Sequence, residues 1–211
     1  MFETKTKDNS SLYLKVLLRR SFLNLGAVEK NVALDLFSGK GEIASRAYAE
    51  FKELHLVEKD SRQIKGLKEK FLNSERARIW QMDNLKFLHK KLSGFSELNL
   101  VDFDAYGSPN QQIKEFFSNW KLKAPLLVFA TDGFALARIR GGPFCPEMYF
   151  AGADKDGAYG YDSVLAKNYD RLIRGFWEEL SKRHKFRIEL FKLIWKKGGQ
   201  VAYYGTLIKP D

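Results

Sequence analysis

Residues 32–44, VALDLFSGKGEIA, join an apolar segment to a helical pattern through an acidic, glycine-rich turn. Gly39 can adopt the positive φ of a sharp turn, and Gly41 has no Cβ, so we expect the backbone to approach a bound molecule closely. The spacing Gly-x-Gly-x-x-Ala also fits a dinucleotide fingerprint. However, Asp35 at the strand end would repel a pyrophosphate and attract a cationic amino-acid group. S-adenosylmethionine carries such a group, so the turn favours that ligand over a nicotinamide dinucleotide.

Two further acids end predicted strands. Glu58 closes the apolar segment 53–58, 19 residues after Gly39. In a β-α-β unit, an acid at this point reaches the ribose hydroxyls of a ligand held over the first turn; an exposed strand-end glutamate is the alternative. Asp83 follows the predicted strand 77–81, where it can accept a hydrogen bond from an adenine amine, cap the next helix, or do both.

The segment 98–104 carries two acids at its end, Asp102 and Asp104, and the turn AYGSP follows. A buried parallel strand tolerates carboxylates near its carboxyl edge, where α/β sites form. Asp104 could accept an N–H from an exocyclic amine, and the carbonyl of Ala105 could accept another. Tyr106 could stack on a base or, alternatively, pack into the core. Asp102 points to the same strand face and could instead be the catalytic acid or support the first turn.

The remaining pattern indicates one domain, because 211 residues with 45% hydrophobic content suit one core better than two. Helices are expected at 11–25, 41–51, 61–73, 110–119 and 163–183, and further strands at 125–131, 185–195 and 200–208. The last two strands read as an antiparallel hairpin. In the first helix, the predicted buried stripe is Leu14, Leu17, Leu18, Phe22 and Leu25. Residues 133–162 form a loop-rich insertion with six glycines.

These strand-end signals resemble the class I S-adenosylmethionine-dependent methyltransferases. The likeness is greatest to the tRNA guanine-N2 dimethyltransferase family, whose fourth-strand motif Asp-x-Asp-Pro-Phe/Tyr-Gly-Ser/Thr-Pro compares with residues 102–109, DFDAYGSP. Only the first proline differs, since Ala105 stands in its place. The family's Thr-Asp pair after strand five is matched by Thr131 and Asp132. The family's additional C-terminal domain has no counterpart, so the resemblance covers the catalytic domain, residues 10–208.

The resemblance implies an α/β fold with a Rossmann-like seven-stranded sheet, mostly parallel, with a C-terminal antiparallel hairpin and helices on both faces. It also implies that the first turn holds the methionine part of the cofactor, Glu58 the ribose and Asp83 the adenine. The expected cofactor-binding residues are Asp35, Phe37, Ser38, Gly39, Gly41, Glu58, Lys59, Asp83, Asn84 and Asp102. The expected catalytic residues are Asp104, Ala105, Tyr106 and Asp102. Because proline fixes φ and has no N–H, Ala105 could loosen the loop.

The net charge of +10 favours a polyanionic partner, such as tRNA or another structured RNA, over a merely solvated basic surface. The excess is uneven, because residues 182–211 contain eight Lys or Arg against two acids. The residues expected to contact nucleic acid are Arg19, Arg20, Arg138, Arg140, Lys196 and Lys197.

The chain shows no long apolar run and no signal-peptide pattern, so a cytoplasmic protein without a membrane span is expected. Cys145 is the single cysteine and the three histidines are scattered, so no metal site is expected.

The sequence therefore predicts methylation of an exocyclic base amine and favours guanine N2 in RNA. Two alternatives stay open at this stage. A DNA or protein amino methyltransferase is one, because an Asp-x-x-Tyr turn also resembles the motif of amino N-methylases. A non-catalytic nucleic-acid-binding module that keeps the fold is the other, motivated by Ala105 and by the missing C-terminal domain.

Overall fold

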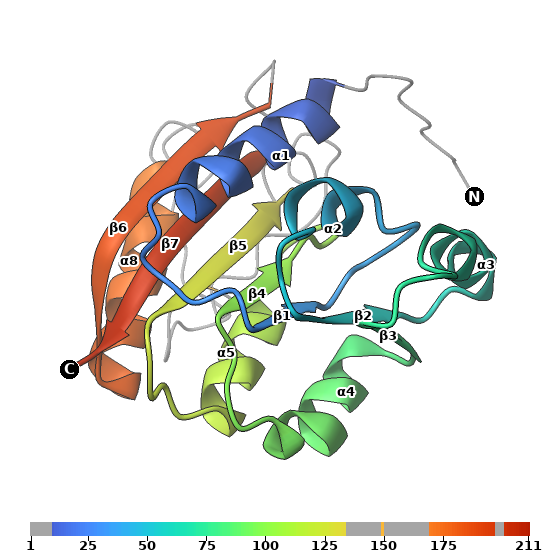
Figure 1. The fold of residues 1–211 in the computed structure, drawn as a ribbon. Coiled ribbons are helices and arrows are strands. Elements are labelled where there is room, and N and C mark those ends of the chain that lie inside the picture. Colours follow the sequence, from blue (N-terminus) through green and yellow to red (C-terminus); the bar gives the residue numbers. More distant parts are fainter. Residues whose placement is uncertain (1–9, 134–148, 150–168, 197–200) are drawn as a thin grey trace, which may run out of the picture.

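A computed structural model describes residues 10–133, 149, 169–196 and 201–211 (Figure 1). Its centre is a seven-stranded sheet in the order β3-β2-β1-β4-β5-β7-β6. The strands are β1 (Val32–Asp35), β2 (Glu53–Glu58), β3 (Ala77–Gln81), β4 (Leu100–Phe103), β5 (Leu126–Asp132), β6 (Phe186–Trp195) and β7 (Ala202–Pro210). Neighbours among β1 to β5 pair in parallel, whereas β7 pairs antiparallel with β5 and with β6. The predicted sheet and its closing hairpin are confirmed.

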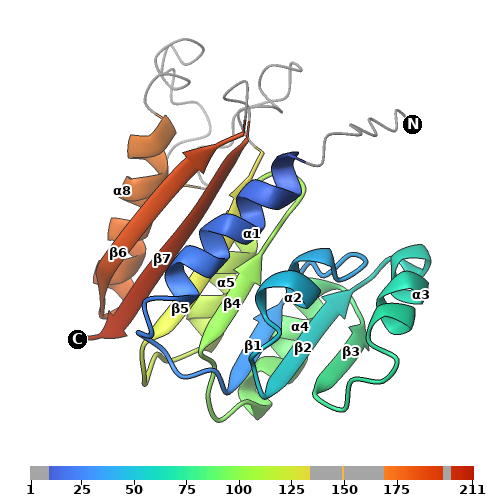
Figure 2. The same ribbon diagram turned by 45° about the horizontal axis from the view of Figure 1, so that its top comes forward.

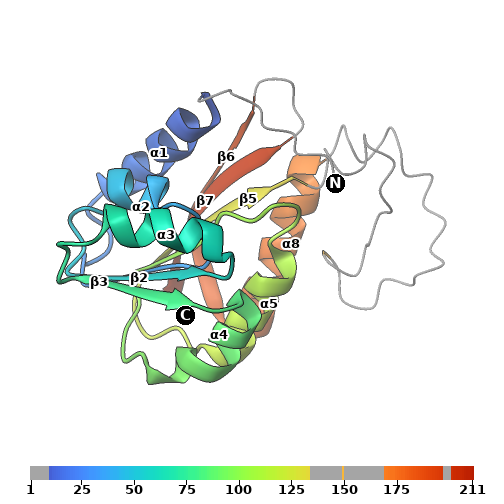
Figure 3. The same ribbon diagram turned by 90° about the vertical axis from the view of Figure 1, so that its right-hand side faces the viewer.

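Helices cover both faces of this sheet, as expected (Figures 2 and 3). One face carries α1 (Ser10–Leu23), α2 (Glu42–Ala47) and α3 (Ser61–Lys70); the other carries α4 (Asn84–Lys91), the short 3₁₀ turn Leu92–Gly94, α5 (Asn110–Asn119) and α8 (Tyr169–His184). Two separate clusters of buried side chains, one on each face, form the core. The expected elements exist, and the observed bounds differ from the expected ones by a few residues.

Helix α1 lies across β5 and β7, and its inward face differs from the predicted stripe. Leu18 and Phe22 are buried, but Leu17 is 49% exposed and Leu25, just beyond the helix, is 54% exposed. The residues that share the inward face with them, at spacings of three and four, are Lys15 and Arg19. Phe22 packs edge-on against Phe129 of β5, with ring centroids 5.5 Å apart. A helix that looks aliphatic and basic in sequence therefore turns two cations toward the sheet.

The strand order reverses between β1 and β4, because the chain adds β2 and β3 on one side and β5 on the other. Asp35, the last residue of β1, is in register with Asp102 of β4, and Phe103 is in register with Ala130 of β5. The carboxyl ends of these parallel strands therefore meet at one edge of the sheet. In open α/β sheets, ligands bind in the crevice outside such a switch point.

Candidate functional site

The turn after β1 is held by its own strand-end acid. Phe37 N–H donates to Asp35 Oδ1 at 3.0 Å, and Ser38 Oγ donates to the Asp35 carbonyl at 3.0 Å. Gly41 N–H then donates to the Ser38 carbonyl at 2.7 Å. The backbone thus curls around Asp35, whose side chain is buried at the end of the strand.

Burial, reinforced by repulsion from Asp102, raises the pKa of Asp35 well above its usual value. The Phe37 N–H and the Arg19 guanidinium act in the opposite direction and do not cancel this effect. A cation placed beside Asp35 would stabilise the ionised carboxylate and would reverse the shift. The site is therefore electrostatically suited to a positively charged group.

Glu58 connects the end of β2 to the same turn. Gly39 N–H donates to Glu58 Oε2 at 2.9 Å, and Asp60 N–H donates to Glu58 Oε1 at 2.7 Å. Each carboxylate oxygen can accept a further hydrogen bond, so a ribose hydroxyl could be added without breaking either contact. Glu58 is thus placed both to fix the turn and to meet a ligand above it.

The two glycines of the turn differ in what surrounds them. Gly39 has φ +52°, and a Cβ there would meet no atom within 4 Å. Gly41 has φ +75°, and its Cβ would lie 2.7 Å from Leu67 Cδ1 and 2.6 Å from Phe71 Cε2. The absent Cβ of Gly41 thus lets the turn pack against α3 and its C-terminal end, while the expected approach of the Gly41 backbone to a ligand stays a prediction. Gly39 is the position that faces open space.

Asp83 caps α4, since its Oδ1 accepts from the N–H groups of Leu85 and Lys86 at 3.1 and 3.3 Å. Its other oxygen lies 3.8 Å from Lys59 Nζ, a largely exposed ammonium. Asn84 accepts from Gln112 Nε2 through Oδ1 at 3.4 Å. The capping role of Asp83 is therefore observed, and its carboxylate stays partly exposed at the end of β3.

Asp104 stands at the exit of β4 between two other elements. Lys15 Nζ of α1 donates to Asp104 Oδ1 at 2.5 Å, and Thr131 Oγ1 of β5 donates to the same oxygen. Burial raises the pKa of Asp104, but attraction by Lys15 and Arg19, with the two hydrogen bonds, outweighs it and lowers that pKa. The carboxylate is thus held ionised at the edge of the sheet.

The loop after Asp104 exposes an aromatic side chain. Tyr106 is fully exposed, whereas Ala105 is buried, so the alternative of a core-facing Tyr106 is wrong. Ala105 N–H, the group that proline would lack, donates to the Phe103 carbonyl at 2.8 Å. Gly107, with φ +92°, accepts from Gly133 N–H at 2.9 Å, which ties the loop to the end of β5.

Asp102 lies two residues earlier and is fully enclosed. Arg19 Nε and Nη2 donate to its two oxygens, each at 2.7 Å, and Tyr48 Oη donates to Oδ2. Both Asp102 and Arg19 are inaccessible to solvent. Arg19 therefore is not on the surface where nucleic-acid contact was expected, because the inward face of α1 turns it toward β4. Asp102 supports the junction of α1 with the sheet and is screened from any acceptor.

A further buried carboxylate, Asp132, ends β5. Its Oδ2 accepts from Tyr149 Oη at 2.8 Å, and Tyr149 Oη in turn lies 2.9 Å from Tyr169 Oη. Ser108 Oγ of the loop after β4 lies 3.5 Å from the same Asp132 oxygen. The sequence reasoning noted Asp132 only as part of a motif. It did not identify Lys15, Tyr48 or Tyr149 as members of the site, although the spacing of Lys15 and Arg19 by four was a usable signal.

The residues predicted to contact nucleic acid are scattered. Arg20 is exposed on α1 and donates to the Arg46 carbonyl at 2.9 Å. Lys196 is half-buried at the end of β6, and its N–H donates to the Val201 carbonyl at 2.9 Å. Arg138, Arg140 and Lys197 lie outside the described residues.

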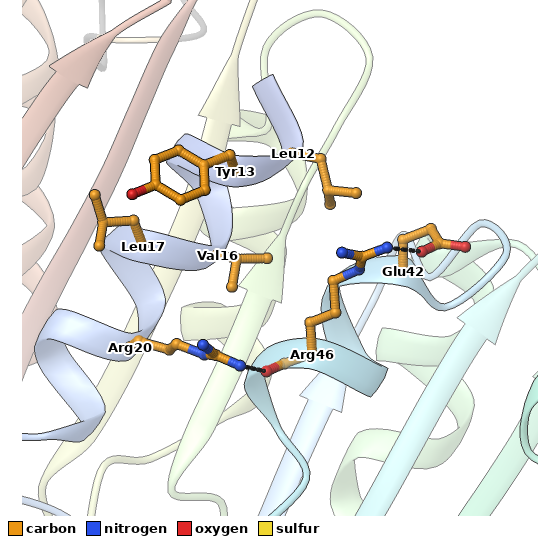
Figure 4. Close-up of a pocket in the computed structure, with 7 residues that line it drawn as sticks. All are labelled: Leu12, Tyr13, Val16, Leu17, Arg20, Glu42 and Arg46. Carbon is orange, nitrogen blue, oxygen red and sulfur yellow. Dashed lines mark hydrogen bonds and ion pairs between the residues drawn. The ribbon is translucent and has the colours of Figure 1, made fainter. Parts of the chain in front are cut away.

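A cavity of about 730 Å³ lies between α1 and α2 (Figure 4). Its lining combines apolar and arginine side chains with one acid: Leu12, Tyr13, Val16, Leu17, Arg20, Glu42 and Arg46. None of the expected cofactor or catalytic residues lines it. Tyr13, which is 67% exposed, and Arg20 both line this cavity.

Two negative findings apply to the part of the chain that the structure describes. No group of three or more His, Cys, Asp or Glu side chains there could hold a metal ion. No helix there combines the length and the apolar character that crossing a membrane requires.

No family model and no curated protein matches this sequence. Solved structures match its fold. Trm1 from Pyrococcus horikoshii, in complex with S-adenosyl-L-methionine, aligns with a TM-score of 0.66 at 13% identity, over 96% of this chain and 55% of that one. M. jannaschii TYW2, in complex with AdoMet, aligns with a TM-score of 0.60 at 11% identity, over 99% and 80%. PH1948 from Pyrococcus horikoshii, named as a candidate RNA methyltransferase, aligns with a TM-score of 0.53 at 16% identity, over 99% and 88%.

At these identities the likeness is one of fold. Together with the observed strand order and the helices on both faces, it shows that the chain has the Rossmann-like fold of the class I methyltransferases.

Proposed function

We propose that this chain is an S-adenosylmethionine-dependent N-methyltransferase that acts on an exocyclic amine of a nucleic-acid base, guanine N2 of tRNA or another structured RNA. The observation that carries the proposal is the β4 exit. There an ionised carboxylate, Asp104, stands next to the fully exposed ring of Tyr106, at the edge of the sheet where the glycine turn also lies.

The cofactor fits the residues present. Gly39 leaves open space above the turn, and Asp35 favours a cationic group there. Glu58 keeps acceptor capacity for a ribose hydroxyl, and the partly exposed Asp83 is available to an adenine amine. The S-adenosylmethionine in the Trm1 and TYW2 structures supports the same assignment. When bound, S-adenosylmethionine supplies a methyl group that is electrophilic because it is attached to a sulfonium.

The chain's own residues then act mainly by positioning. A purine amine is a poor nucleophile until its lone pair is turned toward the methyl group. Asp104 is placed to accept one N–H of that amine, and Tyr106 offers a face on which the base can stack, worth about 1–3 kcal/mol. As the nitrogen gains the methyl it loses one proton, which the ionised Asp104 can accept. Most of the acceleration in such a reaction comes from holding the reactants in line.

RNA as the substrate rests on charge and on the α1 surface. The net charge of +10 attracts a polyanion, and the α1–α2 cavity is lined by the cation of Arg20 and the ring of Tyr13, among others. Lys196, partly exposed on the terminal hairpin, is a second candidate for phosphate contact.

A labelled-methyl assay tests the proposal against its alternatives. The protein is incubated with methyl-labelled S-adenosylmethionine and, separately, with bulk tRNA, ribosomal RNA, DNA and protein. Label in RNA that mass spectrometry identifies as N2-methylguanosine is the expected result. Label in DNA or protein alone would move the reaction to another acceptor. Cofactor binding without transfer to any of these substrates would favour the non-catalytic module.

A further inference from the structure

We propose that Lys15 and Thr131 are positioning residues for Asp104: they hold one oxygen of its carboxylate so that the other is presented to the acceptor amine. This inference rests on the proposed function. It adds two residues, from α1 and β5, to a site that otherwise consists of strand-end acids and a loop.

The contacts to Asp104 are one-sided. Lys15 Nζ and Thr131 Oγ1 both donate to Oδ1, and within the described part of the chain no residue bonds Oδ2. The side chain is 15% exposed. Two donors converging on one oxygen fix the rotation of the carboxylate, and they leave the lone pairs of Oδ2 available to an incoming N–H.

Lys15 is itself held in place, unlike a solvated surface lysine. Its side chain is 18% exposed, and its ammonium lies 5.2 Å from the ring centroid of the buried Tyr203. Its backbone carbonyl accepts from Arg19 Nη1 at 3.0 Å. Arg19 is in turn locked onto Asp102, so the position of Lys15 is fixed by the fully buried ion pair below it.

The charges around Asp104 make Lys15 the decisive neighbour. Lys15 and Arg19 face it from α1 and Thr131 from β5, while Asp102 on β4 and Asp35 on β1 are the nearby acids. Burial alone would raise the pKa of Asp104, and Lys15 is the strongest of the opposing influences. Without Lys15, the carboxylate would protonate at a higher pH and would lose its fixed orientation.

The test compares Lys15→Met, Lys15→Arg and Thr131→Val with the wild type. Lys30→Met is the matched control, because Lys30 pairs with Glu50, which is 74% exposed. For Lys15→Met we expect kcat to fall about 100-fold. Cofactor affinity should stay within about 3-fold, and the acid limb of the kcat/KM profile should move up by roughly 1 pH unit or more. Lys15→Arg should keep the pH profile of the wild type. Thr131→Val should lower kcat but shift the acid limb of kcat/KM less than Lys15→Met does. Thermal unfolding and cofactor calorimetry establish that each variant is folded.

Asp104→Asn separates this inference from the proposed function. If Asp104→Asn stays active on every acceptor, Asp104 is not the reacting carboxylate and the positioning roles of Lys15 and Thr131 fall with it. Amine methylation itself is then decided by the labelled-methyl assay on the wild type. If Asp104→Asn is inactive but folded Lys15→Met matches Lys30→Met in kcat and pH profile, the positioning role of Lys15 is wrong while the function stands. Should Lys15→Met not fold, a kcat of folded Thr131→Val equal to that of the wild type would overturn the proposal.

Discussion

The two halves of the candidate site are organised differently. At the β1 turn, the carboxylates of Asp35 and Glu58 accept hydrogen bonds from backbone N–H groups of the adjoining turns. At the β4 exit, Asp102 and Asp104 are held by side chains from elsewhere, chiefly Arg19 and Lys15 of α1. The pKa of Asp35 is raised and that of Asp104 is lowered. The β1 turn is therefore suited to bind a cation, whereas the β4 exit already contains one, the ammonium of Lys15.

The largest effect is expected from breaking the buried ion pair between Arg19 of α1 and Asp102 of β4. Arg19→Met leaves Asp102 buried without its ion-pair partner, so we expect the free energy of unfolding to fall by about 3–5 kcal/mol, measured by urea denaturation. Lys15→Met should cost clearly less, because Asp104 keeps Thr131 and some exposure. Equal losses of unfolding free energy for the two variants would show that the Arg19–Asp102 and Lys15–Asp104 pairs do not differ as described.

The turn offers the next comparison, between its two glycines. Gly41→Ala places a Cβ against Leu67 and Phe71 at positive φ, so we expect a loss of about 1–3 kcal/mol in thermal or urea unfolding. Gly39→Ala meets no neighbour and should cost about 1 kcal/mol from its positive φ. Because its Cβ projects into open space, Gly39→Ala should weaken cofactor binding more than its stability loss explains. If calorimetry showed that Gly41→Ala weakens cofactor binding more than Gly39→Ala does, the ligand would lie elsewhere.

The raised pKa of Asp35 predicts a pH-dependent affinity. A cationic ligand stabilises the ionised carboxylate, so binding should release protons, and the affinity for S-adenosylmethionine should increase as the pH rises through the pKa of the free site. Calorimetry in buffers of different ionisation enthalpy measures this release. Asp35→Asn should abolish it and also weaken binding. Proton release that persists in Asp35→Asn would assign it to another group.

The smallest effect concerns the surface and is read from salt dependence. Each phosphate contact contributes a log-log slope of about −0.7 to −0.9 to RNA binding, so Arg20→Glu should reduce the magnitude of the slope by about one contact. Lys196→Glu should do the same. Lys30→Glu serves as the control, because Lys30 precedes the amino end of β1, whereas the site lies at its carboxyl end. A wild-type affinity that does not change with salt would leave the +10 charge without a role in binding.

Much of the fold was predictable because its signals are local. Apolar runs ending in Asp35, Glu58 and Asp132 mark buried strands that each carry an acid at the carboxyl end. The closing hairpin follows from two long runs around a glycine pair. The exposure of Tyr106 was one of two alternatives. The capping role of Asp83 was also foreseen, because both of its roles need the same position.

What the sequence did not reveal depends on how elements cross. Arg19 looked like part of a phosphate-binding surface, since nothing local shows that α1 packs on the sheet with Lys15 and Arg19 facing inward. The packing around Gly41 was not predictable either, because the side chains that occupy the place of its missing Cβ are those of Leu67 and Phe71, in a later segment. Long-range packing decided both cases.

The most direct test of the central claim is the turnover of Asp104→Asn with its cofactor affinity measured in parallel. The amide keeps the shape but loses the charge that favours the developing positive charge on the amine. We therefore expect kcat to fall on the order of 100- to 1000-fold while S-adenosylmethionine affinity stays within a few-fold. Retention of most activity by Asp104→Asn, with activity lost in a folded Asp102→Asn, would contradict the account and move the reacting carboxylate to Asp102.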